Sequence, residues 1–269
     1  MGGNTAERQK LVAYLSDSHL ALYVRRVLSP RYQVVALNSP EEAEHELLVR
    51  VYEGLLVGRT HRDGSSCLGF VRRVRSKCPS VAIILYCAPE PALFDEIVAF
   101  SRVGIDALVL RGADDLPATL HRVITNAARQ ALGRYALSLL EPRLSPQVAS
   151  IVSLCLMRAD EHVSVDEIAH ELGVTRKTLA TWTAASRSPS PAMLIGWSRL
   201  LAAARLLEDP GRSIESIAHT LRFNSASALN NLMRRYVDQT PGEVRRNGAV
   251  RIVLQSWMRQ LETIRNRQP

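Results

Sequence analysis

In the first half of the chain, hydrophobic residues form short unbroken runs that are separated by amphipathic segments. The runs cover residues 11–15, 33–37, 54–57, 81–86 and 107–110. Helical periodicity marks residues 19–28, 40–49, 68–76 and 91–102, and a further helix is expected from Asp114 onward. Strands that are apolar on both faces, each followed by a helix, predict a doubly wound five-stranded parallel sheet. We therefore expect an α/β domain over residues 1–130.

The second half has a different pattern, in which one short sequence motif occurs twice. Residues 164–172 and 213–221 both begin with Ser and both contain Ile-Ala-His, so each predicts a short helix with one apolar face. A turn and a second helix follow in each copy, and Thr175 and Ser225 are the expected N-caps of these second helices. The pattern predicts an all-α domain with two helix-turn-helix units.

The two copies differ in their caps and in their turns. Ser164 and Glu167 have the spacing of a capping box, whereas the second copy has Ser216 at the position of the glutamate. Gly173 suits the left-handed conformation that ends a helix. Arg222 occupies the equivalent place in the second copy, where a residue with a side chain carries some strain.

Between the copies, residues 191–207 predict one helix of about 25 Å, a spacer that suits two recognition helices in successive major grooves. Together with the Arg199-Leu200 to Leu206-Leu207 pattern of this helix and the ending at residues 240–245, the two copies resemble the AraC/XylS-type transcription regulators over residues 160–247. The chain departs from that family at Arg222, where Gly is usual, and at Leu229, where an aromatic residue is usual. The resemblance implies a sequence-specific DNA-binding regulator that reads two adjacent major grooves.

On the predicted recognition helices, Leu179 of the first unit faces inward, as do Leu229, Leu232 and Tyr236 of the second. By resemblance, the remaining positions contact double-stranded DNA; they are Arg176, Lys177, Ala180, Thr181, Ser225, Ser227, Asn230, Asn231, Arg234 and Arg235. Asparagine suits adenine, lysine suits guanine, and Ala180 or Thr181 suits a thymine methyl group. The arginines are expected to hold phosphates. Ala180 and Thr181 stand where longer polar side chains are common in the family.

The size and order of the first domain resemble a response-regulator receiver. In receivers, an Asp that ends the third strand is phosphorylated beside a metal held by acids at the end of the first; here Gly58 stands in its place. Asp17 keeps one acid of the usual pair, and Arg111 replaces the family's Lys. Because Gly58 offers no carboxylate to form an acyl phosphate, we expect a pseudo-receiver without a phosphorylation site. Asp63 is a candidate substitute, although an Asp beside Gly64 favours turn chemistry.

The connections between these domains follow from helix breakers and periodicity. Residues 131–159 are expected to form a helical linker, interrupted at residues 141–146 and resumed as a helix over 146–159. The DNA-binding domain is expected over 160–248, and a C-terminal amphipathic helix over 249–269, packed on a domain or partner rather than on DNA. The apolar row after Asp114 is expected to cover its own sheet in its first half and is a candidate contact for a homodimer.

Composition adds a class of partner and removes several others. The net charge of +8 favours a polyanion, yet residues 160–248 hold 11 basic and 10 acidic side chains. The four cysteines lack metal-ligand spacing, and His170 and His219 are interpreted as surface histidines, so no metal site is expected. No phosphate-binding loop, nucleophile elbow or His-Glu-x-x-His motif occurs, and neither an enzyme nor a cofactor is expected.

No run approaches about 20 uninterrupted apolar residues, and the N-terminus lacks the order of a signal peptide, so we expect a soluble cytoplasmic protein. The alternative function is a non-DNA adaptor whose pseudo-receiver docks a partner. The near-neutral charge of residues 160–248 and the short side chains at the reading positions keep this alternative open. A small ligand or a protein at the carboxyl ends of the strands also stays open.

Overall fold

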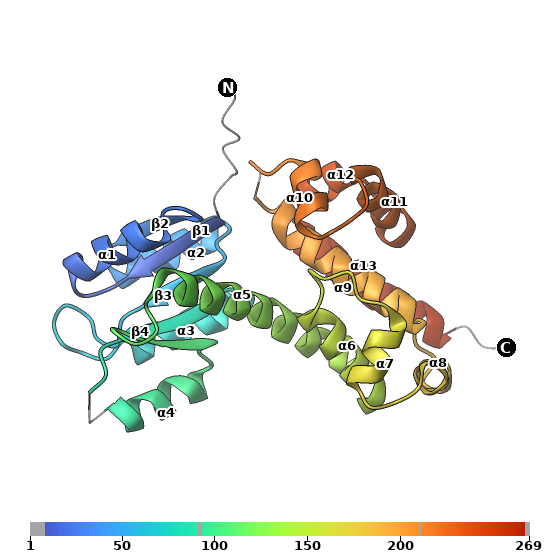
Figure 1. Cartoon of the computed structure of the whole chain (residues 1–269), viewed down its shortest axis with the longest axis horizontal. Helices are drawn as coiled ribbons and strands as arrows, with labels where there is room; N and C mark the ends of the chain where they lie inside the picture. Colours follow the sequence, from blue (N-terminus) through green and yellow to red (C-terminus); the bar gives the residue numbers. More distant parts are fainter. Residues whose placement is uncertain (1–8, 91–92, 210, 267–269) are drawn as a thin grey trace. The chain divides into compact units, whose positions relative to one another are not determined.

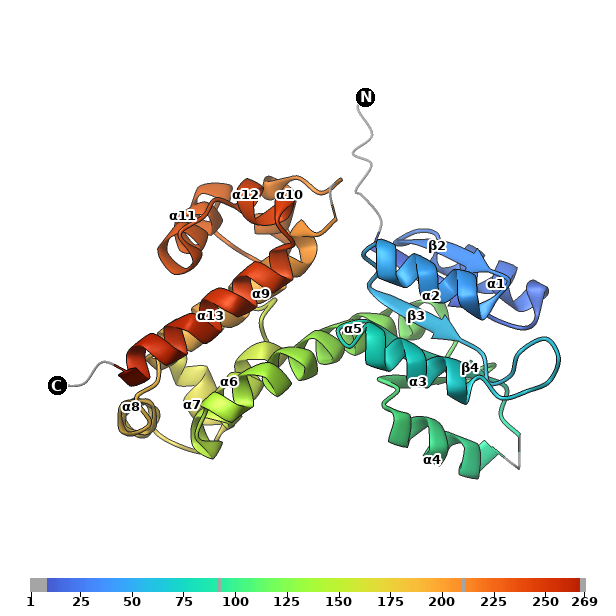
Figure 2. The same cartoon turned by 180° about the vertical axis from the view of Figure 1, so that it is seen from behind.

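The structure is a computed structural model that describes residues 9–90, 93–209 and 211–266 (Figures 1 and 2). The chain divides into two compact units, Met1–Tyr135 and Ala136–Pro269, so the division falls inside helix α5 (Pro117–Leu140). Among the described residues, no helix has both the length and the apolar character needed to cross a membrane.

The first unit contains a five-stranded parallel sheet with the strand order β2-β1-β3-β4-β5. The strands are β1 (Gln9–Tyr14), β2 (Tyr32–Leu37), β3 (Gly54–Val57), β4 (Ala82–Cys87) and β5 (Ala107–Leu110). Leu11 of β1 pairs with Val34 of β2 on one side and with Gly54 of β3 on the other. This strand order is one of the two common doubly wound arrangements, the one found in flavodoxin and in CheY. The predicted doubly wound sheet is confirmed.

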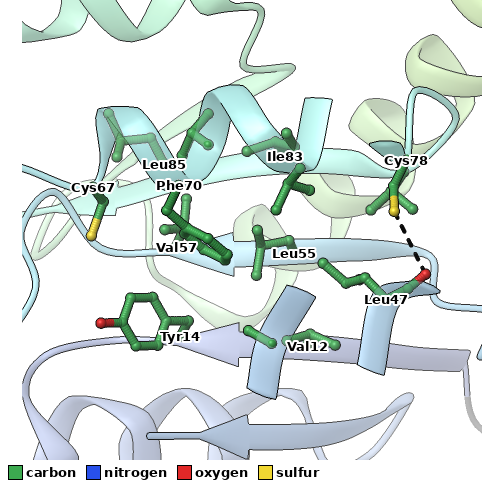
Figure 3. Packing of buried hydrophobic residues seen from close by; sticks show 14 of the residues in the cluster. Val12, Tyr14, Leu47, Leu55, Val57, Cys67, Phe70, Cys78, Ile83 and Leu85 are labelled. Atoms are coloured by element: carbon green, nitrogen blue, oxygen red, sulfur yellow. Dashed lines mark hydrogen bonds between the residues drawn. The ribbon is translucent and has the colours of Figure 1, made fainter. Parts of the chain in front are cut away.

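Helices cover both faces of the sheet. Helices α1 (Ser18–Leu28) and α5 pack on one face through Val24, Leu120 and Ile124. Helices α2 (Pro40–Val49), α3 (Leu68–Lys77) and α4 (Leu93–Val103) pack on the other. In Figure 3, Phe70 of α3 reaches toward Val57 of β3, and its ring meets that of Tyr14 edge-on at 5.3 Å. Two-sided burial explains why the inner strands β3 and β4 are apolar along their whole length.

The second unit is helical. A 3-10 turn, η1 (Glu141–Arg143), leads into helices α6 (Pro146–Met157), α7 (Val165–Glu171), α8 (Arg176–Ala185), α9 (Pro191–Leu207), α10 (Ile214–Thr220), α11 (Ala226–Val237), α12 (Pro241–Arg246) and α13 (Ala249–Asn266). Helix α9 contacts all the other α-helices of this unit from α6 to α13. Such a central helix is nearly all apolar because it is surrounded, and its Trp197 and Leu200 are fully buried.

Helix α13 lies alongside α9 in both views (Figures 1 and 2). Trp257 of α13 stacks on Trp197 of α9, with ring centroids 5.7 Å apart and an angle of 9° between the planes. Glu208, which follows α9, accepts a hydrogen bond of 3.1 Å from the backbone N–H of Val250 at the start of α13. The C-terminal amphipathic helix is thus packed on the helical unit, and α6 also packs on α9.

The sequence-based element boundaries agree with the structure to within a few residues. The helix expected from Asp114 begins at Pro117, and the helix expected over 146–159 ends at Met157. The expected start of the fourth helix at residue 91 lies outside the described residues, and α4 is described from Leu93. The apolar row along α5 is buried: Leu120, Ile124 and Ala127 pack against the sheet.

Candidate nucleic-acid interface

The first helix-turn-helix unit consists of α7, a tight turn and α8. The hydroxyl of Ser164 accepts from the N–H of Glu167 at 3.2 Å, and the carboxylate of Glu167 accepts from the N–H of Ser164 at 2.7 Å. This reciprocal pair is the predicted capping box. Gly173 has a φ of 66°, and its N–H donates to the carbonyl of His170 at 3.0 Å. The turn leaves Thr175 as the N-cap of α8, with its hydroxyl accepting from Thr178.

The second helix-turn-helix unit consists of α10 and α11 and repeats this backbone geometry with different side chains. Arg222 has a φ of 53°, and its N–H donates to the carbonyl of His219 at 3.1 Å. The predicted equivalence of Arg222 and Gly173 is therefore confirmed. Ser213 caps α10 without a reciprocal glutamate, and Ser225 caps α11 by accepting from the N–H of Ala228 at 3.1 Å.

A half-buried arginine on α9, Arg199, holds the turn between α10 and α11. One guanidinium nitrogen of Arg199 donates to the carbonyl of Leu221 at 3.0 Å and to that of Arg222 at 3.3 Å. The guanidinium carbon also lies 4.0 Å from the centroid of the Phe223 ring. Burial lowers the pKa of Arg199. The positive charge meets carbonyl groups at the C-terminal end of α10, where a cation is favoured. Sequence reasoning noted Arg199 only as part of the linker pattern.

The recognition helix of the second helix-turn-helix unit, α11, is held against α9 by aromatic packing. Tyr236 of α11 meets Trp197 edge-on at 5.0 Å. Gly196 makes room for this contact, because a Cβ atom there would lie 2.6 Å from the Tyr236 hydroxyl. Leu229 and Met233 are fully buried, whereas Leu232 is half-buried. Tyr236 faces inward as predicted, although it stays half-buried, whereas Met233 rather than Leu232 takes the fully buried position.

On α8, all four predicted reading positions are exposed: Arg176, Lys177, Ala180 and Thr181. Arg176 lies 3.4 Å from a carboxylate oxygen of Asp166 on α7, and both side chains are 68% exposed. The Thr181 hydroxyl donates to the carbonyl of Lys177 at 3.0 Å. Because this bond uses the hydroxyl proton, Thr181 presents its methyl group and oxygen lone pairs to the surroundings.

On α11, the exposed predicted positions are Ser227, Asn231, Arg234 and Arg235, while Asn230 is half-buried. Ser225 is exposed, but its hydroxyl is occupied as the helix cap. Neither α8 nor α11 contains an acidic residue; the acids of the two units lie on α7 and α10, at Asp166, Glu167, Glu171 and Glu215. Both second helices therefore present polar and basic surfaces without carboxylates of their own.

In the α/β unit, Asp17 and Gly58 lie just after the carboxyl ends of β1 and β3. Asp17 caps α1, and its carboxylate accepts from the N–H of His19 at 2.8 Å. Gly58 follows β3, and a Cβ atom there would meet no other atom closer than 3.8 Å. Asp63 accepts from the N–H of Ser65 at 2.9 Å, which is turn chemistry, and its hydrogen bonds to Ser65 lower its pKa.

Cysteine and histidine chemistry gives no further site in the described part of the chain. All four cysteines are free and buried, and burial raises the pKa of Cys155 to about 12. No group of three or more His, Cys, Asp or Glu side chains in the described ranges is placed to hold a metal ion. His170 and His219 are exposed on the first helices of the two units.

Comparison with known proteins places these observations in a class. Residues 168–247 match the family described as a helix-turn-helix domain, of the AraC type. No curated protein sequence matches the chain. The second unit thus contains an AraC-type helix-turn-helix domain, and the first is receiver-like by its strand order. An AraC-type helix-turn-helix domain is typical of DNA-binding transcription regulators.

Solved structures similar to this chain include receiver domains. One is the N-terminal signal receiver domain of a response regulator from Bacteroides fragilis, at 18% identity and a TM-score of 0.39. The match covers 45% of this chain and 97% of that chain. Another is a CheY-like receiver domain protein from Methanospirillum hungatei JF-1, at 13% identity, 46% and 96% coverage and a TM-score of 0.41. A third is a response regulator from Chloroflexus aurantiacus J-10-fl, at 18% identity and a TM-score of 0.40; the match covers 45% of this chain and 98% of that chain. The fold assignment itself rests on the strand order, not on these scores.

Proposed function

We propose that this chain is a sequence-specific transcription regulator in which both helix-turn-helix units read bases, in two adjacent major grooves of double-stranded DNA. The observation that carries this proposal is the repeated geometry: both turns have a left-handed residue at the same place, Gly173 and Arg222, and both second helices leave an acid-free face exposed. Recognition helices placed in this way enter the major groove with their exposed side chains toward the base edges.

We assign the DNA contacts of the predicted reading residues by their chemistry. Asn230 or Asn231 bonds the N6 and N7 edge of adenine, and Lys177 meets guanine. Ala180 and the outward methyl group of Thr181 pack on a thymine methyl group. Phosphates are held by the exposed cations Arg176, Arg234 and Arg235. Ser225 and Ser227 contact DNA at the start of α11, the opposite end of that helix from its two arginines.

The experiment that tests the proposal is selection from mixed genomic fragments followed by sequencing and footprinting. The purified chain should retain a recurring sequence and should protect two patches about 10 base pairs apart on one face of the duplex. Protection confined to one groove would contradict two-groove reading. Failure to retain any sequence above random DNA would instead favour the adaptor, in which the helical domain has no base readout.

We also propose that the receiver-like domain is not phosphorylated. Gly58 supplies no carboxylate, and the remaining acid, Asp17, is engaged as the cap of α1. Incubation with acetyl phosphate should leave the mass of residues 1–130 unchanged. Gly58→Asp is a sterically tolerated control that should remain poorly phosphorylated, because the metal site still lacks its second acid. An aspartyl phosphate in the wild-type chain would overturn this part of the proposal.

A further part of the proposal is that the first unit joins two copies of the chain. The buried row of α5 is used by the chain's own sheet, so the contact has to use other side chains. The large apolar side chains that the first unit leaves exposed include Leu22 at 62%, Phe94 at 74% and Leu116 at 65%. Sedimentation of residues 1–145 and of residues 146–269 tests the assignment. A first fragment that stays monomeric at high micromolar concentration would exclude it.

A further inference from the structure

Helices α1 and α5, which cover one face of the sheet, contain arginines but no acidic residue, and one of these arginines, Arg134, pairs with Asp106. Residues 18–39 and 116–140 together contain six arginines and no Asp or Glu. The helices on the opposite face are balanced by acids, because α2 contributes Glu44, which pairs with both Arg73 and Lys77 of α3. The α1/α5 face, defined by these two residue ranges, is therefore the place where the first unit concentrates positive charge.

Two arginines of this face line the same pocket. Arg31, which follows α1, and Arg122 of α5 lie at a pocket of about 400 Å³ whose wall includes Val27 and His121. Both arginines are exposed, and no ion pair joins either of them to an acidic residue of the described chain. The dipole of α1 explains cations in its last turn, such as Arg26, but Arg31 lies beyond that turn and Arg122 is on another helix.

The surroundings of Arg31 and Arg122 add no negative charge. One guanidinium nitrogen of Arg31 lies 3.4 Å from both ring nitrogens of His121. Burial, and then the charge of Arg31, lower the pKa of His121, which favours the neutral imidazole. The pocket thus has two guanidinium groups that lack a counter-ion of their own, and a guanidinium fork matches the oxygens of a phosphate in pairs.

The distribution of positive charge along the chain indicates which ligand the α1/α5 face binds. The segment that reads DNA, residues 160–248, holds 11 basic and 10 acidic side chains, so it has little net charge for phosphate attraction. Sequence-independent affinity for DNA comes from neutralising phosphates with arginine and lysine. Once the helix-turn-helix units are bound, a basic surface on the same chain meets neighbouring DNA at a high effective concentration.

We propose that the α1/α5 face, through Arg31 and Arg122, binds phosphates of duplex DNA outside the segment held by the helix-turn-helix units. This inference rests on the proposed DNA-binding function. It makes the receiver-like domain a second, sequence-independent DNA contact in addition to any role in dimerisation.

The test compares two duplexes that share the selected site, one ending at the footprint and one extending about 20 base pairs beyond it on each side. The full-length variant Arg31→Ala/Arg122→Ala is titrated against both at several salt concentrations. On the long duplex we expect affinity to fall by about 10-fold or more in 0.1 M salt, and the slope of log K against log salt to fall by about two. On the short duplex the change should stay within about twofold.

The matched control is Arg72→Ala/Arg102→Ala, which removes the same charge from exposed arginines of α3 and α4 on the opposite face. It should bind both duplexes like the wild type, and Arg31→Lys/Arg122→Lys should recover most of the lost affinity. Thermal unfolding confirms that each variant is folded. Equal losses on both duplexes, equal losses from the control, or no loss on the long duplex would overturn the inference.

Failure of the proposed function gives a different result. A wild-type chain without base readout binds the selected site and a random duplex of the same length equally. The α1/α5 face is then tested on the random duplex, where Arg31→Ala/Arg122→Ala should still bind more weakly than Arg72→Ala/Arg102→Ala. Equal binding by these two variants would overturn the inference in that case as well.

Discussion

The first helix-turn-helix unit, residues 164–185, and the second, residues 213–237, have one backbone plan and two different surfaces. Helix α8 presents Arg176 and Lys177 at its start, followed by small side chains. Helix α11 begins with small side chains, presents Asn230 and Asn231 in its middle and has its two arginines in the last turn. The same backbone therefore presents cations at the start of α8 and amide groups in the middle of α11, and these two kinds of group hydrogen-bond different base edges.

The two turns reach the same conformation by different means. Gly173 adopts a positive φ without steric cost, and no atom lies within 4 Å of where its Cβ would be. Arg222 adopts nearly the same φ against its own preference. The second turn is held by Arg199, which bonds two of its carbonyl groups and covers Phe223. The unfavourable positive φ of Arg222 is thus offset by the contacts of Arg199, which comes from a helix distant in the sequence.

The largest effect is expected from removing that contact. Arg199→Ala deletes charge-assisted hydrogen bonds to two carbonyls and a cation–π contact, so the free energy of unfolding should fall by about 2 to 3 kcal/mol. Urea denaturation measures this loss. Arg199→Lys should recover only part of it, because an ammonium group does not reproduce the planar fork. Protection of the second DNA patch should weaken before that of the first. An unchanged unfolding midpoint would show that the second turn needs no support.

Base readout by the second unit is expected to depend on its amides. Asn231→Ala should cost about 1 to 3 kcal/mol of binding free energy on the preferred site and little on random DNA. Arg234→Ala, from the same helix, should instead weaken binding to all sequences alike. Fluorescence anisotropy with both duplexes separates these outcomes. Equal losses for Asn231→Ala on specific and random DNA would show that α11 does not read bases.

Exchanging the residues at the two turns should give changes of opposite sign. Gly173→Ala places a side chain at a φ of 66° and should destabilise the chain by about 1 kcal/mol. Arg222→Gly removes that strain but gives the unfolded chain more freedom, so a gain of at most about 0.5 kcal/mol is expected. The shift of the urea midpoint reports both. A loss of stability from Arg222→Gly would mean that the Arg222 side chain has a stabilising contact of its own.

The smallest effect concerns the ion pair between α7 and α8, the two helices of the first helix-turn-helix unit. Asp166→Asn removes the partner of Arg176, and since both side chains are 68% exposed, stability should change by less than about 0.5 kcal/mol. DNA affinity should rise by less than about threefold, because Arg176 is then free to meet a phosphate. Titration at low and at moderate salt measures this. A decrease in affinity would indicate that Asp166 positions Arg176 for binding.

The pattern of apolar residues determined the elements of this protein, and sequence-local chemistry determined their ends. Five two-sided strands with intervening helices predicted the sheet, and Ser164 with Glu167 predicted the capping box that the structure contains. The positive φ of Arg222 followed from its alignment with Gly173. These features depend on residues a few positions apart, where the geometry of the backbone fixes which side chains meet.

The tertiary structure decided what depends on residues far apart in the chain. Arg199 lies 22 residues from the carbonyl it holds at Leu221, and no local pattern marks that bond. Met233 rather than Leu232 fills the core, because the direction from which α9 packs on α11 selects the buried row. The exposure of Arg31 and Arg122 at one pocket also required α1 and α5 to share a sheet face. Periodicity states that a face is buried, but only the packing of distant elements determines which residues it contains and what they contact.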